Sequence, residues 1–248
     1  MGSAYFDLPR PRVLAHRGLA LEAPENTLLA FSKAAEVGAA YIETDVHVSR
    51  DGTAVVSHDP SLRRVAGRDL RVVDLTMDEL RRIDLGHGQG FSSLEEALDA
   101  FPETRFNIDV KVEAALAPTV AAIGRTGAAG RVLLTSFHDG RRRRAAGLVV
   151  DAVSSPGRAG VIRALVAAPF GPGPLTGAVR GASALQVPER AGPVPVVTRA
   201  FVERAHRAGL EVHVWTVNEI ADMTRLLELG VDGLVTDRAD RALPLILP

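Results

Sequence analysis

The sequence predicts an α/β fold of the (β/α)8 class, a TIM barrel with a small insertion subdomain after the second strand. Strand-like and helix-like patterns alternate about eight times over 248 residues, which is the size and rhythm of such a barrel. Polar residues recur at or near the ends of the strand-like runs, where barrels carry their chemistry. We expect one barrel domain over residues 1–248, with residues 59–92 inserted as a small subdomain.

The first part of the chain predicts a strand, a helix and a second strand. Residues 13–15 are a short apolar run, and Asn26 is the expected N-cap of a helix that ends before Gly38. Residues 41–48 alternate at period two and predict the second strand, which 53–58 extends. The charged, turn-rich segment 59–92 then interrupts the rhythm and includes one short helix at 78–83.

Regular alternation resumes after this segment. Apolar runs predict strands, and apolar residues at helical spacing predict helices. The expected strands are 105–111, 132–137, 149–154, 184–187, 211–217 and 233–237, and the expected helices are 94–101, 115–126, 139–147, 158–168, 199–208 and 219–229. The Gly/Pro-rich segment 169–183 is expected to be a loop.

Composition narrows the class of protein. With 46% hydrophobic residues the chain can bury a large aliphatic core, and its net charge of -1 offers no global field for nucleic acid, which we do not expect as a partner. No apolar run approaches the roughly 18 residues that cross a bilayer, so no transmembrane segment is expected. The absence of cysteine excludes disulfides and thiolate metal sites. Together with a start that lacks a leader-like pattern, it predicts a cytoplasmic location.

Two expected strands carry charged residues on one face. The alternation of 41–48 places Glu43, Asp45 and His47 on one side of the strand, and that of 106–111 does the same for Asp109 and Lys111. A buried carboxylate is costly unless it is paired or bound to a metal. Three carboxylates from two buried strands therefore indicate a divalent cation held by oxygen or imidazole, and a metal-dependent enzyme.

Other enzyme architectures fit less well. Gly18-Leu19-Ala20 does not continue with the spacing of a dinucleotide-binding turn, which argues against an open doubly wound sheet. An enolase-type barrel takes one acidic ligand from each of three successive strands, whereas Glu43 and Asp45 share one strand. An amidohydrolase would have a His-X-His pair after the first strand, where this chain has His16-Arg17-Gly18.

Seven short motifs give the chain a resemblance to a known family. They are His16-Arg17-Gly18, Pro24-Glu25-Asn26-Thr27, Glu43-Thr44-Asp45, His58-Asp59, Asn107-Ile108-Asp109-Val110-Lys111, Trp215-Thr216-Val217-Asn218 and Gly230-Val231-Asp232-Gly233-Leu234-Val235-Thr236-Asp237. In this order and spacing they resemble the glycerophosphodiester phosphodiesterase family over nearly the full chain. The resemblance implies hydrolysis of a small glycerophosphodiester to glycerol 3-phosphate and an alcohol. It also implies one divalent cation, Mg²⁺ or Ca²⁺, and an insertion after His58.

The resemblance also implies a role for each matching residue. The implied set is Glu43, Asp45 and Asp109 as metal ligands, His16 and His58 as general acid and base, and Arg17 and Lys111 on the phosphate oxygens. Many family members have glutamate where this chain has Asp109, so its alternative is a structural ion pair with Lys111. The resemblance leaves open which histidine is the acid, and whether water attacks directly or opens a cyclic phosphate.

Further residues have weaker expectations. Trp215 and Phe137 are expected to form an apolar wall of the substrate pocket. Glu25 either contacts the metal site or a catalytic histidine, or has no role there. His47 is expected to be structural, and the run Arg141-Arg142-Arg143-Arg144 is expected to be a solvated helix face.

Two other functions stay open. A lysophospholipase D-type activity would require residues 159–183 to form an apolar lid, for which Val161, Ile162, Leu165 and Phe170 are candidates. The simpler reading of those residues is a helix that covers the barrel. The other alternative is an inactive barrel that binds glycerophosphoryl groups. The sequence does not indicate the head group or the oligomeric state.

Overall fold

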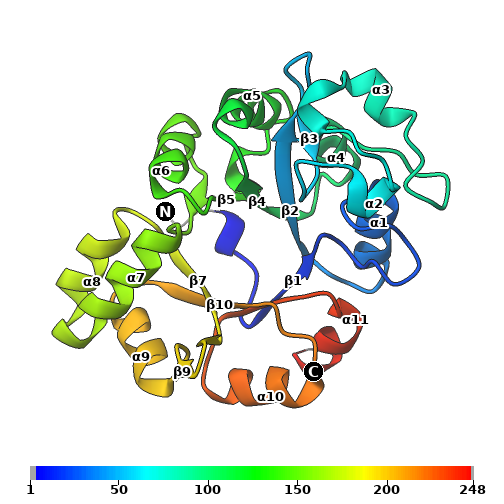
Figure 1. Ribbon diagram of the computed structural model, residues 1–248. Coiled ribbons are helices and arrows are strands. Elements are labelled where there is room, and N and C mark those ends of the chain that lie inside the picture. Colours follow the sequence, from blue (N-terminus) through cyan, green and yellow to red (C-terminus); the bar gives the residue numbers. More distant parts are fainter. Residues whose placement is uncertain (1–3, 247–248) are drawn as a thin grey trace.

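Eight parallel strands form the wall of a barrel in the computed structural model, which describes residues 4–246 (Figure 1). Between the two end strands of the sheet, the Ser183 N–H donates to the Ser154 carbonyl at 2.9 Å, so the wall is nearly closed. The expected barrel is therefore confirmed. In their order around the wall the strands are β6 (Val153–Ser154), β5 (Val132–Thr135), β4 (Arg105–Val110), β2 (Tyr41–Val48), β1 (Arg12–His16), β11 (Gly233–Thr236), β10 (Glu211–Trp215) and β7 (Ala184–Pro188).

Helices surround the barrel wall on the outside (Figure 1). Their apolar sides and the outward side chains of the strands share one large core, as in other barrels. These helices are α1 (Leu28–Glu36), α4 (Leu94–Ala100), α5 (Leu116–Arg125), α6 (Asp139–Leu148), α7 (Arg158–Ala167), α8 (Pro172–Val179), α9 (Arg199–Arg207), α10 (Ile220–Glu228) and α11 (Ala239–Ala242). Short 3-10 helices are η1 (Ala4–Phe6), η2 (Val72–Asp74), η3 (Glu113–Ala115), η4 (Ala129–Arg131), η5 (Ala168–Phe170) and η6 (Leu243–Leu245).

The Gly/Pro-rich segment expected to be a loop is largely helical, so that prediction was wrong. Helix α8 begins at Pro172, and the fixed φ of proline suits the first helical position. Leu175 and Val179 are fully buried against the core. Burial of this apolar side outweighs the low helix propensity of the glycines in the segment.

Strand register decides which polar side chains share a level inside the barrel. His16 of β1 lies opposite Glu43 of β2, and Asp45 of β2 lies opposite Asp109 of β4. Alternate residues of the same strands, such as Ile42, point outward into the apolar core. The polar residues therefore meet at the carboxyl ends of neighbouring strands.

The opposite end of the barrel is closed by a buried ion pair. Arg12 is 3% exposed, and its Nη1 donates to the Glu211 carboxylate at 2.8 Å. Its Nε donates to the Tyr41 hydroxyl, and its Nη2 donates to the carbonyls of Phe6 and Leu8. The first described residues are thereby held across the floor of the barrel.

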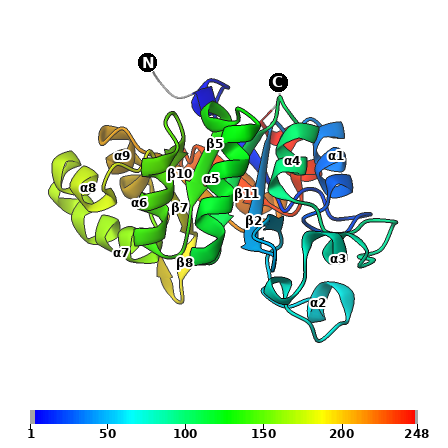
Figure 2. The same cartoon turned by 90° about the horizontal axis from the view of Figure 1, so that it is seen from above.

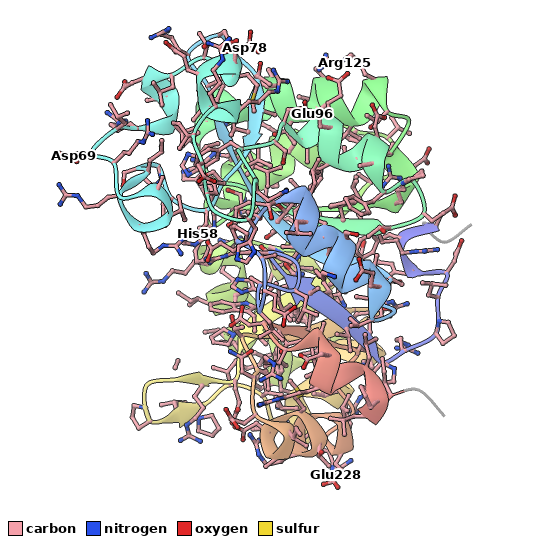
Figure 3. All side chains as sticks on the ribbon, turned by 90° about the vertical axis from the view of Figure 1, so that its right-hand side faces the viewer. His58, Asp69, Asp78, Glu96, Arg125 and Glu228 are labelled. Atoms are coloured by element: carbon pink, nitrogen blue, oxygen red, sulfur yellow. The ribbon has the colours of Figure 1, made fainter. Side chains whose placement is uncertain are left out.

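Two excursions project on the carboxyl-end side of the barrel (Figures 2 and 3). The first contains α2 (Arg63–Ala66) and α3 (Met77–Arg81) and follows β3 (Ala54–Val56), which pairs antiparallel with β2. It has its own apolar cluster, formed by Val55, Leu62, Val72, Met77, Leu80, Ile83 and Phe91. The second is a hairpin of β8 (Arg190–Ala191) and β9 (Val194–Pro195), which the sequence did not indicate. No helix of residues 4–246 is long and apolar enough to cross a bilayer.

The arginine run of α6 is not the solvated face that its composition predicted. Arg142 is 2% exposed, and its Nη2 donates to Asp139 at 2.8 Å and to the Val179 carbonyl at 3.1 Å. Arg141 Nη1 donates to the carbonyls of Val110 and Lys111 at the end of β4. These two side chains of α6 point toward the barrel. The sequence shows four identical residues in a row, so it does not reveal that two of them are buried.

We expect Arg142→Met to lower the free energy of unfolding by about 2–4 kcal/mol, because it leaves buried carbonyl groups at the end of α8 without a donor. Chemical denaturation measures the change. Arg143→Met is the matched control, since the Arg143 side chain is 41% exposed, and it should leave the midpoint unchanged. Equal effects of the two substitutions would contradict a structural role for Arg142.

Candidate active site

His16 ends β1 and is held by an acidic residue from the last strand of the barrel. Its Nδ1 lies 2.6 Å from Asp237 Oδ1, and Asp237 is itself fixed by Asn218, whose Nδ2 donates to Oδ2 at 2.8 Å. Burial alone would lower the pKa of His16, but the hydrogen bond to Asp237 and the charge of Glu43 outweigh it and raise the pKa above its usual value. The bond to Nδ1 turns Nε2 toward Glu43, whose Oε2 lies 3.8 Å away.

A tight turn directs Arg17 into the site. Arg17 has a left-handed φ of 58° and Gly18 follows with φ 85°, where a Cβ would lie 2.6 Å from the backbone of Ala30. Arg17 Nη1 pairs with Glu25 Oε1 at 3.0 Å, and its Nε lies 3.3 Å from Asp45 Oδ2. The turn thus places a guanidinium beside a buried carboxylate.

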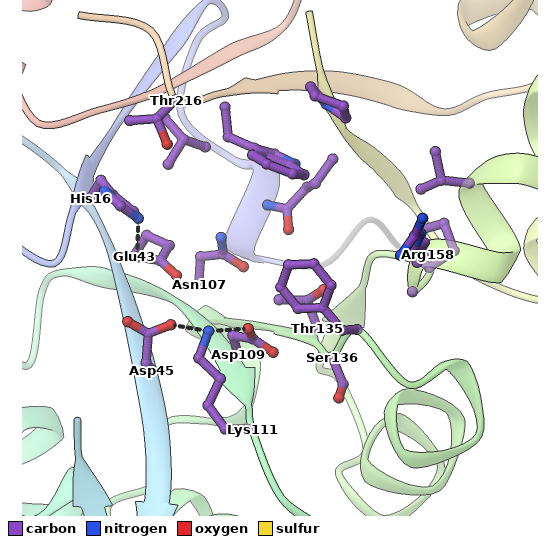
Figure 4. Close-up of a pocket in the computed structure, with 18 of the residues that line it drawn as sticks. His16, Glu43, Asp45, Asn107, Asp109, Lys111, Thr135, Ser136, Arg158 and Thr216 are labelled. Carbon is purple, nitrogen blue, oxygen red and sulfur yellow. Dashed lines mark hydrogen bonds and ion pairs between the residues drawn. The ribbon is translucent and has the colours of Figure 1, made fainter. Parts of the chain in front are cut away.

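Lys111 bridges two buried carboxylates (Figure 4). Its Nζ lies 2.6 Å from both Asp45 Oδ1 and Asp109 Oδ2. Burial would raise the pKa of Asp45, but the charges of Lys111 and Arg17 hold it below its usual range. For Asp109, burial dominates and raises the pKa. The ammonium therefore stabilises the ionised form mainly of Asp45.

Three oxygens of this cluster have no hydrogen-bond partner. They are Glu43 Oε2, Asn107 Oδ1 and Asp109 Oδ1, and all three are buried. Burial and the nearby charge of Asp45 raise the pKa of Glu43 to about 8. Buried acceptors without a donor are rare and costly, so these atoms point to a missing cationic or donor group.

Asn26 supports Asp45 and is not the helix cap that the sequence predicted. The cap of α1 is Thr27, whose hydroxyl accepts from the Ala30 N–H. Asn26 has φ 56°, its Nδ2 donates to Asp45 Oδ2 at 3.1 Å, and its Oδ1 accepts from the Thr44 hydroxyl. Asparagine suits both a helix cap and a buried hydrogen-bonding position. The sequence favours the cap, because the contact of Asn26 with β2 is not visible in it.

His58 is held by a network of ion pairs that reaches α2 in the excursion after β3. Its Nδ1 lies 2.7 Å from Asp59 Oδ1, and Arg64 of α2 pairs with both Asp59 and Glu25 at 2.6 Å. Glu25 also pairs with Arg17, so it bridges the turn after β1 and helix α2. His47 Nε2 lies 3.2 Å from the His58 carbonyl. His47 therefore contacts the backbone of the loop that carries His58.

These residues line one cavity of ≈ 600 Å³. Phe137 and Trp215 form part of its wall, with ring centroids 6.4 Å apart in an edge-to-face arrangement. Figure 4 shows His16, Glu43, Asp45, Asn107, Asp109 and Lys111 gathered on one side of the cavity, with Arg158 across it. The cavity is of the size that holds a small organic ligand.

The structure brings together most of the residues singled out from the sequence. Those that line the cavity are His16, Arg17, Glu43, Asp45, His58, Asp109, Lys111, Phe137 and Trp215. Glu25 lies behind Arg17 rather than on the cavity wall. Within residues 4–246, no three acidic or imidazole groups stand close enough together to form a ready-made metal cluster. Lys111 lies between two of the expected ligands instead.

The partners of the two histidines were missed from the sequence. Asp237 follows the last strand and ends the motif that begins at Gly230, but the sequence indicates no role for it. Closure of the barrel puts β11 beside β1, with Ala15 opposite Thr236, so the next residues of both strands meet. The sequence does not indicate a role for Arg64, because its contacts with Asp59 and Glu25 depend on how the segment after β3 folds.

Comparison with known proteins agrees with this architecture. The model of the glycerophosphoryl diester phosphodiesterase family matches residues 16–241. A probable glycerophosphodiester phosphodiesterase 2 of Mycobacterium tuberculosis is 44% identical over 230 residues, which cover 92% of this chain and 87% of the relative. A glycerophosphodiester phosphodiesterase of Caldanaerobacter subterraneus is 28% identical over 249 residues and covers 94% of this chain and 97% of its own length.

A solved structure shares the fold. The crystal structure of a putative glycerophosphoryl diester phosphodiesterase from Silicibacter pomeroyi superposes with a TM-score of 0.81 at 23% identity, covering 96% of this chain and 94% of that one. The barrel order and the family match are consistent with each other. This chain belongs to the glycerophosphoryl diester phosphodiesterase family.

Proposed function

We propose that this chain hydrolyses glycerophosphodiesters to glycerol 3-phosphate and an alcohol, with His16 and His58 as general acid and base. The observation that carries the proposal is that two imidazoles, the cationic side chains of Arg17 and Lys111 and three oxygens without a hydrogen-bond partner line one cavity. The family match and the activity named for the relatives support it. We also propose that residues 59–92 are an inserted subdomain and that the protein is cytoplasmic, as its lack of cysteine suggests.

The donor set suits one hard divalent cation. The oxygens of Glu43, Asn107 and Asp109 that lack a hydrogen-bond partner are the ligand type that Mg²⁺ and Ca²⁺ prefer. We propose Glu43, Asp45 and Asp109 as protein ligands, with Asp45 exchanging one of its present partners, such as Lys111 or Asn26, for the cation. When bound, the cation would polarise a phosphoryl oxygen and neutralise its charge. Because a ligating carboxylate must be ionised, binding would release the proton that Glu43 holds below pH 8.

Side chains of the protein would carry out proton transfer and hold the phosphate. Both imidazoles have Nδ1 beside a carboxylate, so Nε2 is the nitrogen available to take or give a proton. One would remove the proton of the attacking hydroxyl or water, and the other would give a proton to the departing alcohol oxygen. Arg17 and Lys111 would hold the non-bridging oxygens, where charge develops in the transition state.

The direct test is a matrix of metals and substrates on the purified protein and its variants. We expect turnover of glycerophosphocholine with Mg²⁺ or Ca²⁺, and a loss of at least about a hundredfold in His16→Ala and His58→Ala, the usual contribution of an acid or base group. Glu43→Ala should also lose cation binding in titration calorimetry. Full turnover by either histidine variant would end the acid–base proposal, and binding without any turnover would favour the inactive barrel.

The bridge made by Lys111 can be tested through stability. Lys33 and Lys111 are the two lysines of the sequence, and Lys33 is on the surface. We expect Lys111→Met to cost about 3 kcal/mol in free energy of unfolding without added cation, because two buried carboxylates lose their shared partner. Lys33→Met should leave the denaturation midpoint unchanged. An unchanged midpoint in both variants would mean that the carboxylates do not depend on the ammonium.

The Asp237 contact predicts a pH effect. We expect Asp237→Asn to lower the pKa of His16, because the hydrogen bond to the carboxylate raises it in the wild type. The extra stability from this pair should be fullest below about pH 6.5 and should vanish as pH rises through the pKa of folded His16. NMR titration measures the pKa, with the His16 signal assigned by its absence in His16→Ala. Asp240→Asn is the control, since Asp240 pairs with Arg238.

A further inference from the structure

One cationic residue of the cavity has no part in the proposed reaction. Among the described residues that line the cavity, three are lysine or arginine, namely Arg17, Lys111 and Arg158. Arg158 begins helix α7 and is exposed to solvent. Figure 4 shows it across the cavity from the carboxylates of β2 and β4. A phosphate held by Arg17 and Lys111 would therefore leave Arg158 free to contact another part of the substrate.

The Arg158 side chain has no partner in the protein. Within residues 4–246 its guanidinium makes no hydrogen bond or ion pair. The other two cations of the cavity are both paired, Arg17 with Glu25 and Lys111 with Asp45. The positive charge of Arg158 is therefore available to a ligand without breaking any contact.

A carboxylate close to the start of α7 is already occupied. Asp139 of α6 accepts from the Gly157 N–H at 3.4 Å, so it lies next to the residue before Arg158. Its two oxygens pair with Arg142 and with Arg163, each at 2.8 Å. Asp139 therefore neutralises two other guanidinium groups and leaves Arg158 unpaired.

Helix formation does not explain a cation at this position. The first turn of a helix is the positive end of its dipole, where a positive charge is unfavourable. Helices α2 and α9 also begin with an arginine, but each of these has an acceptor. Arg63 pairs with Asp69 at 3.1 Å, and Arg199 Nη2 donates to the Glu228 carbonyl at 2.9 Å. Arg158 lacks such a contact, so its charge serves the cavity rather than the helix.

The backbone of Arg158 is held next to the phosphate-facing groups. Its N–H donates to the Phe137 carbonyl at 3.2 Å, and the ring centroid of Phe137 lies 5.6 Å from Lys111 Nζ. A Cβ on Gly157 would lie 2.6 Å from the Ser136 carbonyl oxygen, so this close approach requires glycine. One aromatic residue thus separates Lys111 from the start of α7.

The cavity has room for both ends of a diester. Its volume is ≈ 600 Å³, and pockets of about 300–1,000 Å³ hold whole small-molecule ligands. A substrate whose phosphate lies at Lys111 can therefore extend past Phe137 to Arg158. Apolar side chains, among them Phe137, Pro156 and Ile162, line the same part of the wall. They keep water away from one side of the guanidinium, which strengthens its attraction for an anion.

We propose that Arg158 binds an anionic group on the alcohol part of the substrate, so that the enzyme prefers glycerophosphodiesters whose head group carries a carboxylate, such as serine. The proposal rests on the proposed function and names its substrate class. Glycerol has no charge and the phosphate is held by Arg17 and Lys111, so only the leaving alcohol can supply a second anion. A guanidinium binds a carboxylate through two parallel N–H···O bonds. Arg158 would thus act in the choice of substrate and not in bond cleavage.

The test compares two substrates that differ by one carboxylate, glycerophosphoserine and glycerophosphoethanolamine. We expect wild-type kcat/KM to be about fivefold higher on glycerophosphoserine at low ionic strength, the effect of a well-formed ion pair at an open site. Added salt should reduce this ratio. Arg158→Met should lower kcat/KM on glycerophosphoserine about fivefold and leave that on glycerophosphoethanolamine within about twofold. Arg158→Glu should reverse the preference, because the new carboxylate repels that of serine and attracts the ethanolamine ammonium.

Arg82→Met is the matched control, because Arg82 is exposed, does not line the cavity and its replacement removes the same charge. It should leave the ratio unchanged. A wild-type ratio near one, loss of the ratio in both methionine variants, or equal losses on both substrates in Arg158→Met would overturn the Arg158 subsite while leaving the proposed function intact. No turnover of either substrate by the wild type would instead end the proposed function.

Discussion

The site depends on one ammonium group placed between two carboxylates inside a barrel. Asp45 and Asp109 face each other across neighbouring strands, and without Lys111 their charges would be buried together at high cost. The same arrangement limits what the site can hold, since Lys111 takes one oxygen of each carboxylate. Three other oxygens, among them Glu43 Oε2, are left for a cation. Lysine and metal would thus share the neutralisation of one acidic cluster.

Each of the two imidazoles of the site is oriented by a carboxylate. Asp237 directly follows β11, which pairs with β1, and Asp59 lies at the start of the excursion after β3. Arg64 joins Asp59 to Glu25, and Glu25 joins Arg17. The excursion after β3 is therefore connected by ion pairs to Arg17, one of the groups proposed to hold phosphate. Hydrogen bonds of this kind fix the ring orientation on which proton transfer depends.

The polarity of the cavity follows from the two kinds of element that form it. Strand ends supply charged side chains, because inward positions at the barrel mouth are open to ligand. Helix α7 and the β8–β9 hairpin, which lie outside the strand wall, supply apolar side chains. The charged and the apolar parts of the cavity thus belong to different parts of the fold, so loop changes can alter one without the other.

The sequence by itself determined the barrel class, the order of the barrel strands and of most helices along the chain, and the polar faces of β2 and β4, because periodicity depends only on local geometry. Together with the family motifs it also identified most of the residues that meet in the cavity. Tertiary structure decided the rest. Burial made Pro172–Val179 a helix, turned Arg142 inward and took Asn26 from its expected cap to Asp45. The contact of His16 with Asp237 and that of Arg64 with Glu25 also depend on distant segments, which local patterns do not encode.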